Sequence, residues 1–152
     1  MTHFSLIPAS YAVLRRGVRR DEVLLLLRRN TGYRDGHWAL LAGHVEPGES
    51  AYEAAAREAY EEATVRVRVE DLTPLTTYHR TQRGAGPIEQ RCDFFFEAGT
   101  WTGDPVIAEP QKCADMRWWR LDALPEPISP HERTVLGWLA EGAPPPILTS
   151  GF

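Results

Sequence analysis

The stretch GHVEPGESAYEAAAREAYEEATV, residues Gly43–Val65, decides the fold of this chain. From Ser50 to about Ala63 it is rich in strong helix formers. Ser50 followed three residues later by Glu53 has the spacing of a capping box, so the helix is expected to begin there. One narrow face of this helix carries only small side chains and can lie close against a sheet: Ala51, Ala55, Ala59 and Ala63.

Another face of the same helix carries three glutamates. Glu58 and Glu61 are three residues apart, and Glu58 and Glu62 are four apart, so their carboxylates share one helical face. Like charges at these spacings repel by roughly 0.2–0.5 kcal/mol per pair. They form either a solvated acidic face, which is common, or a site for a hard cation. Mg²⁺ favours carboxylate oxygens and is often shared with substrate phosphates.

The loop before the helix supports the cation site. Gly43 is followed by five residues and Glu49, then by seven residues and the pair Arg57-Glu58, with Glu61-Glu62 shortly after. This pattern closely resembles the Nudix box of the MutT-like family. The box covers 23 residues here, and the surrounding chain, with Trp38-Ala39-Leu40 before the box and a run of strands after it, also looks like the family.

The resemblance implies a fold, a cofactor and a set of roles. The fold is α/β (α+β), a Nudix-type α/β/α sandwich with a mixed β-sheet, and the cofactor is Mg²⁺, for which Mn²⁺ can substitute. The metal ligands that it implies are Gly43, through its backbone carbonyl, Glu58, Glu61 and Glu62. Arg57 orients Glu49, which acts on the attacking water or on a metal, and Glu61 is also expected to take part in catalysis.

The chain departs from the family pattern at two places. Thr64 stands where family members usually have glycine, and Leu41-Ala42 stand where they often have Pro-Gly. The glycine after the box ends the helix in a left-handed conformation, which a β-branched threonine strongly disfavours. Either the helix ends differently here or Thr64 is strained. The charged positions of the box are all kept.

Candidate residues also lie outside the box. Glu109, in a loop well after it, resembles the additional metal ligand or base of many Nudix enzymes, with an ordinary loop glutamate as the alternative. Arg28 is a candidate phosphate ligand and His79 a candidate substrate contact; a solvated arginine and a structural histidine are the alternatives. Three aromatic residues are candidates for stacking on a base or for the core: Tyr33, Trp38 and Phe95.

The remaining hydrophobic pattern predicts a mixed sheet with helices on its faces. Strands are expected at 6–16, 22–29, 37–41, 64–69, 75–80, 88–98 and 116–121, and a second helix at 130–140. The unbroken aliphatic run at 23–27 predicts a strand that is buried on both faces. The expected organisation is one domain over residues 1–143, followed by a proline-rich tail at 144–152 outside the core.

Composition narrows the functional classes. The formal charge of -4 argues against binding of a nucleic acid polymer, although a divalent cation lets an acidic protein accept one anionic nucleotide. No apolar run reaches the ~20 residues of a membrane span, and the N-terminus lacks a signal-peptide pattern. A cytoplasmic protein with no membrane partner is therefore expected. Cys92 and Cys113 do not suit a disulfide framework or a zinc site.

The leading hypothesis is a hydrolase that cleaves the pyrophosphate linkage of a nucleoside diphosphate derivative, by attack of water at phosphorus. A nucleoside triphosphate, oxidised ones included, is the default substrate, because the flanking markers for NADH, coenzyme A, ADP-ribose and diadenosine polyphosphates are not seen. The alternative is a catalytically silent Nudix-fold module that binds a nucleotide or a protein. Such modules usually lose box carboxylates, and this chain keeps them, which favours the enzyme.

Overall fold

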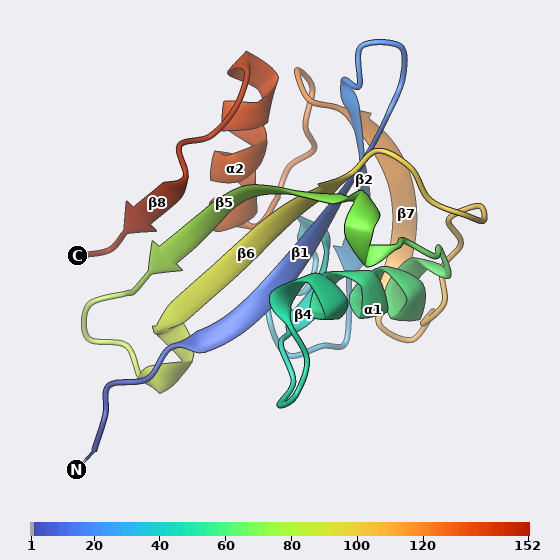
Figure 1. The fold of residues 1–152 in the computed structure, drawn as a ribbon. Helices are drawn as coiled ribbons and strands as arrows, with labels where there is room; N and C mark the ends of the chain where they lie inside the picture. Colours follow the sequence, from blue (N-terminus) through green and yellow to red (C-terminus); the bar gives the residue numbers. More distant parts are fainter. Residues whose placement is uncertain (1) are drawn as a thin grey trace.

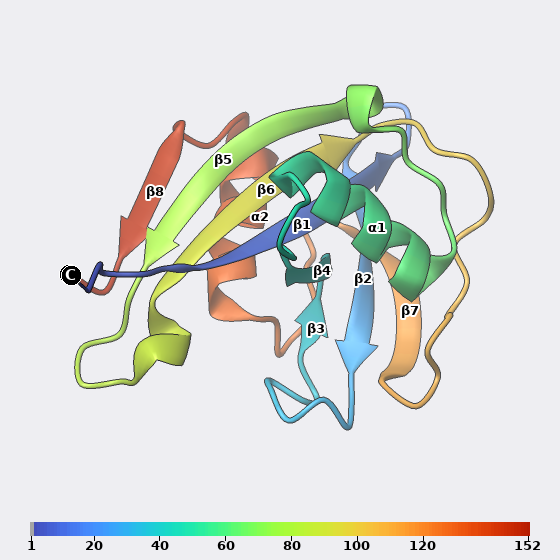
Figure 2. The same cartoon turned by 60° about the horizontal axis from the view of Figure 1, so that its bottom comes forward.

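The computed structural model describes residues 2–152 and is built around a mixed eight-stranded sheet (Figures 1 and 2). Its strands are β1 (Ile7–Arg16), β2 (Glu22–Arg28), β3 (Trp38–Ala39), β4 (Leu41–His44), β5 (Leu72–Arg80), β6 (Arg91–Ala98), β7 (Cys113–Arg120) and β8 (Ile147–Ser150). The order is β3-β2-β1-β6-β5-β8, with β4 paired to β1 and β7 paired to β2. The pairs β1–β6 and β5–β8 are parallel and the others antiparallel, so the predicted mixed sheet is confirmed.

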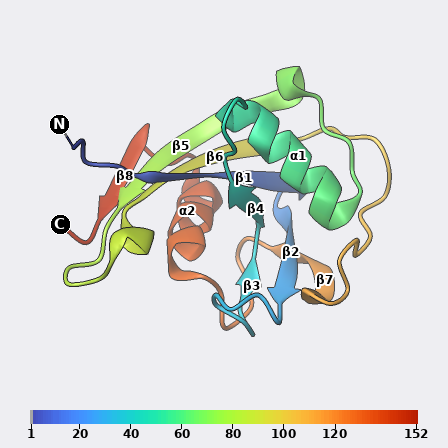
Figure 3. The ribbon, with the colours of Figure 1, turned by 90° about the horizontal axis from the view of Figure 1, so that it is seen from below.

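Two helices, α1 (Ala51–Ala63) and α2 (Pro130–Glu141), cover opposite faces of this sheet (Figure 3). Successive side chains of a strand point to opposite faces, and β1 shows the result. Tyr11 and Val13 pack into the cluster that contains the buried face of α2, whereas Ala12 and Leu14 pack into the cluster under α1. The predicted α/β/α sandwich and both predicted helices are confirmed. Among the described residues, neither helix is long and apolar enough to cross a membrane.

The strand predicted at 64–69 is wrong. Val65 and Val67 are buried in the α1-side cluster, which explains their alternation with exposed arginines. The segment nevertheless makes only one isolated bridge, between Arg66 and Thr102, because no strand runs beside it, and it continues into a short 3₁₀ helix at Val69–Asp71. The strand predicted at 37–41 is likewise divided, into β3 paired with β2 and β4 paired with β1.

The C-terminal residues also differ from the expected free tail. Residues 147–150 form β8, which adds a parallel strand to the edge of the sheet beside β5 (Figure 1). Proline cannot donate a backbone hydrogen bond, but its carbonyl still accepts one. The Thr76 hydroxyl donates to the Pro145 carbonyl at 2.8 Å, and the Thr77 amide donates to that of Pro146 at 3.1 Å. The prolines therefore lead the chain into the sheet.

Candidate active site

The helix that carries the glutamates is positioned by its start and by its small residues. The Ser50 hydroxyl accepts a hydrogen bond from the Glu53 amide at 3.1 Å, which satisfies one of the free donors at the helix start. The buried positions of α1 are all alanines, so the helix lies close to β1 and β4: Ala54, Ala55, Ala59 and Ala63. The glutamates therefore lie over β4, the strand that contains Gly43, the first residue of the box.

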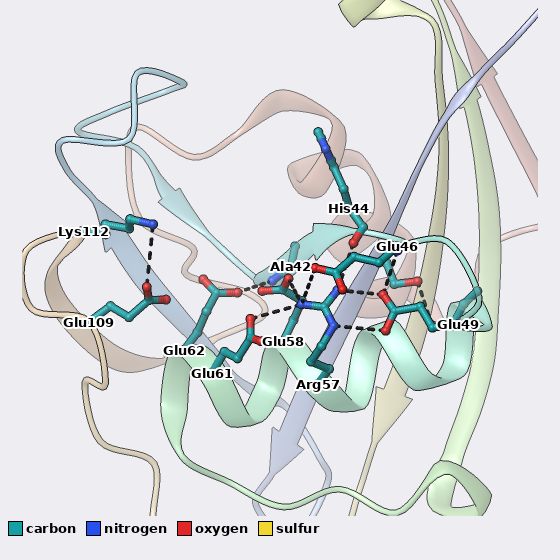
Figure 4. A network of polar contacts seen from close by, with 12 residues as sticks. Ala42, His44, Glu46, Glu49, Arg57, Glu58, Glu61, Glu62, Glu109 and Lys112 are labelled. Carbon is teal, nitrogen blue, oxygen red and sulfur yellow. Dashed lines mark hydrogen bonds and ion pairs between the residues drawn. The ribbon is translucent and has the colours of Figure 1, made fainter.

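Arg57 joins the loop before α1 to the carboxylates on the helix (Figure 4). Its guanidinium donates to Glu49 at 2.7 and 3.1 Å, to Glu58 Oε1 at 2.7 Å and to Glu61 Oε2 at 3.1 Å. It also donates to the His44 carbonyl at 3.0 Å. The hydrogen bond from Arg57 is the main reason that the pKa of Glu49 lies below its usual range. The arrangement keeps Glu49 ionised and fixes the loop against the helix.

Glu58 fits into a space that only a glycine leaves open. A Cβ atom built on Gly43 would lie 2.0 Å from Glu58 Oε1, so the carboxylate occupies the place where any other residue would carry its side chain. Burial raises the pKa of Glu58, although the hydrogen bond and charge of Arg57 act in the opposite direction. Gly43 therefore brings its own backbone and a partly desolvated carboxylate together.

Glu62 lies one helical turn from Glu58 and faces the same strand. Its Oε1 accepts a hydrogen bond from the Ala42 amide at 2.7 Å. Burial raises the pKa of Glu62 well above its usual range, and the nearby charge of Glu58 raises it further. A cation between these two carboxylates would relieve their repulsion and favour the ionised form of both.

These carboxylates line one wall of a pocket of about 290 Å³, which we call the glutamate pocket. It is lined chiefly by Arg28, Asn30, Thr31, Ala42, Gly43, Glu58, Glu62, Glu109 and Lys112. Glu109 lies near Glu62 at the C-terminal end of α1, with its carboxylate 3.7 Å from the Lys112 ammonium (Figure 4). Arg28 is held by hydrogen bonds to the Tyr33 carbonyl at 2.8 Å and to the Thr31 hydroxyl at 3.1 Å. Glu61 is more exposed and reaches the site through Arg57.

The loop that carries Glu109 is attached to the C-terminal end of α1. The Val106 amide donates to the Ala63 carbonyl at 3.0 Å, and the Ala108 amide donates to the Glu62 carbonyl at 3.2 Å. Both carbonyls belong to the last helical turn, where no intrahelical donor is left. The residue after the helix, Thr64, has φ 61° and ψ 9°, the left-handed conformation. The C-terminal end of α1 therefore holds the loop that carries Glu109 beside Glu62 through these two hydrogen bonds.

The donor set fits a hard divalent cation. Glu58 and Glu62 offer carboxylate oxygens beside Gly43, whose missing side chain leaves the space that Glu58 occupies. Among the described residues, no group of three or more carboxylate, imidazole or thiolate side chains is placed to hold a metal ion by itself. One or two carboxylates can hold a hard cation when waters and substrate phosphates complete its shell.

A second cavity, of about 360 Å³, opens beside the glutamate pocket and shares Arg28, Ala42 and Gly43 with it. We call it the side cavity. Its other lining residues include Ala9, Tyr11, Tyr33, Ala39, Leu40, His44, Ile88, Arg91, Ser129, His131 and Glu132. Sequence reasoning missed Glu132, His131 and Arg91 entirely. At the start of a helix a glutamate is ordinarily a solvated residue that favours the helix dipole, and nothing local marks this one as buried.

Other predicted residues lie elsewhere. His79, on β5, lines neither pocket and packs against Phe152 with 4.7 Å between ring centroids, so we do not retain it as a substrate contact. Trp38 and Phe95 are buried in the α2-side core, where Trp38 meets Trp119 edge-on and Phe95 stacks on Tyr11. Tyr33 alone of the three aromatic candidates lines the side cavity.

Known proteins resemble this chain over most of its length. The family model described as the NUDIX domain matches residues 6–139. The NAD-capped RNA hydrolase NudC of Stutzerimonas stutzeri is 32% identical over 153 residues, covering 96% of this chain and 50% of the relative. Its counterpart in Shigella flexneri is 36% identical over 124 residues, covering 82% of this chain and 44% of the relative. The chain thus spans about half the length of the curated relatives it matches.

Solved structures show the same fold. A MutT NUDIX hydrolase from Burkholderia pseudomallei superposes with a TM-score of 0.77 at 25% identity, covering 88% of this chain and 98% of that one. The NUDIX domain of Shewanella oneidensis NrtR, solved with ADP ribose, superposes with a TM-score of 0.70 at 20% identity, covering 91% of this chain and 89% of that one. The second likeness concerns the fold alone.

Proposed function

The chain belongs to the Nudix family, and on that premise we propose that it is a Mg²⁺-dependent hydrolase that cleaves the pyrophosphate linkage of a nucleoside diphosphate derivative. The observation that carries the proposal is the glutamate pocket, in which Glu58, Glu62 and Glu109 face one another beside Arg28. A pocket with this many carboxylates accepts a polyanionic substrate only when cations are present to neutralise the charge.

Glu58, Glu62 and the Gly43 carbonyl would hold the metal. Mg²⁺, when bound, would neutralise phosphate charge and lower the pKa of the attacking water. Arg57 keeps Glu49 and Glu58 in place through its shared hydrogen bonds. Mn²⁺ is expected to substitute, because it also prefers oxygen ligands.

Other residues of the site would bind the substrate phosphates or take the proton of the attacking water. Arg28, whose guanidinium is already fixed by two hydrogen bonds, is placed to bind a phosphate oxygen. Water attacks phosphorus, the bond from phosphorus to the bridging oxygen breaks, and the leaving phosphate keeps that oxygen. A carboxylate must take the proton of the water, and Glu109 and Glu49 are the two candidates. Lys112, beside Glu109, supplies a positive charge to the lining of the pocket.

We propose two candidate substrates, in order of preference. A nucleoside triphosphate that is converted to its monophosphate remains the first candidate, including oxidised nucleotides. The curated relatives are named as NAD-capped RNA hydrolases, so the sequence prediction that excluded a nucleic acid polymer is not carried further. A dinucleotide-linked pyrophosphate at an RNA end is the second candidate.

The test is a product-release screen of purified protein with Mg²⁺ or Mn²⁺. Substrates should include nucleoside triphosphates, NADH, ADP-ribose and NAD-capped RNA. We expect metal-dependent release of a nucleoside monophosphate or a monophosphate-ended product from at least one of them. Metal-independent turnover would overturn the proposed chemistry. Tight nucleotide binding with no turnover on any substrate would instead favour the silent binding module.

A further inference from the structure

We infer that the side cavity binds the planar heterocycle of the substrate and that Glu132 selects a heterocycle that carries an exocyclic amino group. This inference rests on the proposed function and names the substrate class for the same site. The two pockets share Arg28, Ala42 and Gly43, so a ligand with its pyrophosphate in the glutamate pocket reaches the side cavity without leaving the protein.

The size and lining of the side cavity suit a flat ring. Its volume of about 360 Å³ lies at the lower end of the range for small-molecule sites. About half of the lining is small or apolar, including Ala9, Ala39, Leu40 and Ile88, and Tyr33 also lines the cavity. Aromatic and apolar surfaces of this kind bind the face of a heterocycle and leave its edge to polar groups.

Glu132 is the buried polar group that meets such an edge. Its side chain is 3% exposed, yet it lines the side cavity. Its Oε1 accepts a hydrogen bond from the Leu40 amide at 2.6 Å. Its other neighbours are the Ser129 hydroxyl, which also acts on this carboxylate, and the His131 ring, 3.8 Å from Oε2 and already engaged by the Tyr11 hydroxyl at 3.0 Å. A carboxylate oxygen accepts more than one hydrogen bond, so Oε2 can also accept one from a ligand.

A buried carboxylate without a cationic partner is costly, which is why its place in a cavity is informative. Among the described residues, no arginine or lysine lies within ion-pair distance of Glu132, and burial keeps His131 neutral by lowering its pKa to about 2. An amino group on the ligand would donate to Oε2. A ring that presents a carbonyl there would place two acceptors against each other, which disfavours its binding.

Protonation of Glu132 supplies an independent readout. Burial raises its pKa to about 7, opposed by the hydrogen bonds from the Leu40 amide and the Ser129 hydroxyl. The charged and titratable groups around it come from several elements: Tyr11, Arg28, His44, Arg80, Arg91, Asp93 and His131. The ionised carboxylate accepts a hydrogen bond at Oε2, whereas a proton on Oε2 turns that position into a donor, so preference for amino-bearing ligands should increase as pH rises from 6 to 8.

The experiment is calorimetric binding of nucleosides, which carry no phosphate and so need no metal, to the full chain. The matched probes are guanosine against inosine, and cytidine against uridine, because each pair differs in the amino group. Wild-type protein should bind the amino-bearing member of at least one pair about tenfold or more tightly at pH 8. The discrimination should shrink at pH 6. Equal binding within both pairs at pH 8 would overturn the inference.

Two variants and a control complete the design. Glu132→Gln keeps the acceptor for the Leu40 amide, so the fold is retained, and discrimination should fall to about threefold or less with no pH dependence. Tyr33→Ala should weaken both members of a pair alike. Glu126→Gln, at an exposed position before α2, should behave as wild type. Undiminished discrimination in Glu132→Gln would overturn the role of this residue. Because no turnover is measured, a failure of the proposed hydrolysis would not affect these readouts.

Discussion

Thr64 adopts an unfavourable backbone conformation at the end of α1. Its φ of 61° lies in the left-handed region, where a β-branched side chain is strained. Of the two alternatives that the sequence left open, the structure shows the left-handed one. In this conformation its amide donates to the Tyr60 carbonyl at 2.9 Å and ends α1. The chain then continues to Val65, which is buried under the helix.

Replacing Thr64 with glycine should stabilise the protein. Thr64→Gly removes the strained Cβ while the backbone keeps its path, and the free energy of unfolding should rise by about 1 kcal/mol. Urea denaturation measures it. Thr73→Gly is the control, because Thr73 is an exposed residue of β5 with ordinary backbone angles and its loss should destabilise. A destabilised Thr64→Gly variant would mean that the threonine side chain makes a contribution that outweighs its strain.

Glu62 is the residue at which metal binding and turnover should depend most on charge. Glu62→Gln retains an oxygen for the Ala42 amide but removes one charge and one strong ligand. Turnover should fall by at least ~100-fold and metal affinity should fall with it, as measured at limiting and saturating Mg²⁺. Stability without metal should hold or rise slightly, because the repulsion between Glu62 and Glu58 is gone.

The control lies on the same helix. Glu53 is exposed in the first turn of α1, and Glu53→Gln should leave turnover nearly intact. Unchanged activity in Glu62→Gln would remove this residue from the machinery and with it the main support for the metal site.

At the scale of elements, the contact between α1 and β4 brings helix and strand close enough to form a site. Gly43 on β4 makes this contact possible, because the Glu58 carboxylate fills the space beside it. Gly43→Ala should displace that carboxylate, since the new Cβ would lie 2.0 Å from Oε1. We expect metal affinity and turnover to fall by at least ~10-fold with little change in fold, because Gly43 has no positive φ that alanine would disturb.

A glycine on the other helix provides the matched control. Gly137 lies on the exposed side of α2, and a Cβ there would meet nothing within 4 Å. Gly137→Ala should raise the free energy of unfolding by roughly 0.5–1 kcal/mol, because alanine is the better helix former, and should leave turnover unchanged. If the two variants behaved alike in a kinetic assay, the close approach of Glu58 to Gly43 would have no functional weight.

At the scale of the whole molecule, the free energy of unfolding should depend on pH because Glu132 and His131 are buried in the side cavity. Burial raises the pKa of Glu132 to about 7, above its ordinary 4.5, so the folded protein keeps a proton that the unfolded chain has released. The resulting contribution is complete below about pH 4.5 and is lost as pH rises towards 7. His131 acts in the opposite sense, because its neutral form contributes stability above pH 6.5 that is lost as pH falls.

Comparison of wild type with Glu132→Gln isolates the contribution of Glu132 to stability, because His131 is present in both proteins. The variant should have nearly the wild-type free energy of unfolding at pH 5. At pH 8 it should be more stable by on the order of 1–3 kcal/mol, since wild type then carries an ionised buried carboxylate. Urea denaturation at pH 5, 6.5 and 8 measures the difference. A constant difference across this range would show that Glu132 titrates as an ordinary carboxyl.

The sequence by itself determined α1, its start at Ser50, and the shared face of Glu58, Glu61 and Glu62, whereas it left open how the helix ends at Thr64. These are local properties, set by helix periodicity and backbone sterics over a few residues. Partnership across the sheet is not local. The alternation at 64–69 looked like a strand but found no neighbour, and the prolines before β8 gave no sign that residues 147–150 would join β5. Only the tertiary structure brought Leu40, Arg91 and Glu132 from three distant parts of the chain into one cavity, because burial depends on contacts distant in the chain.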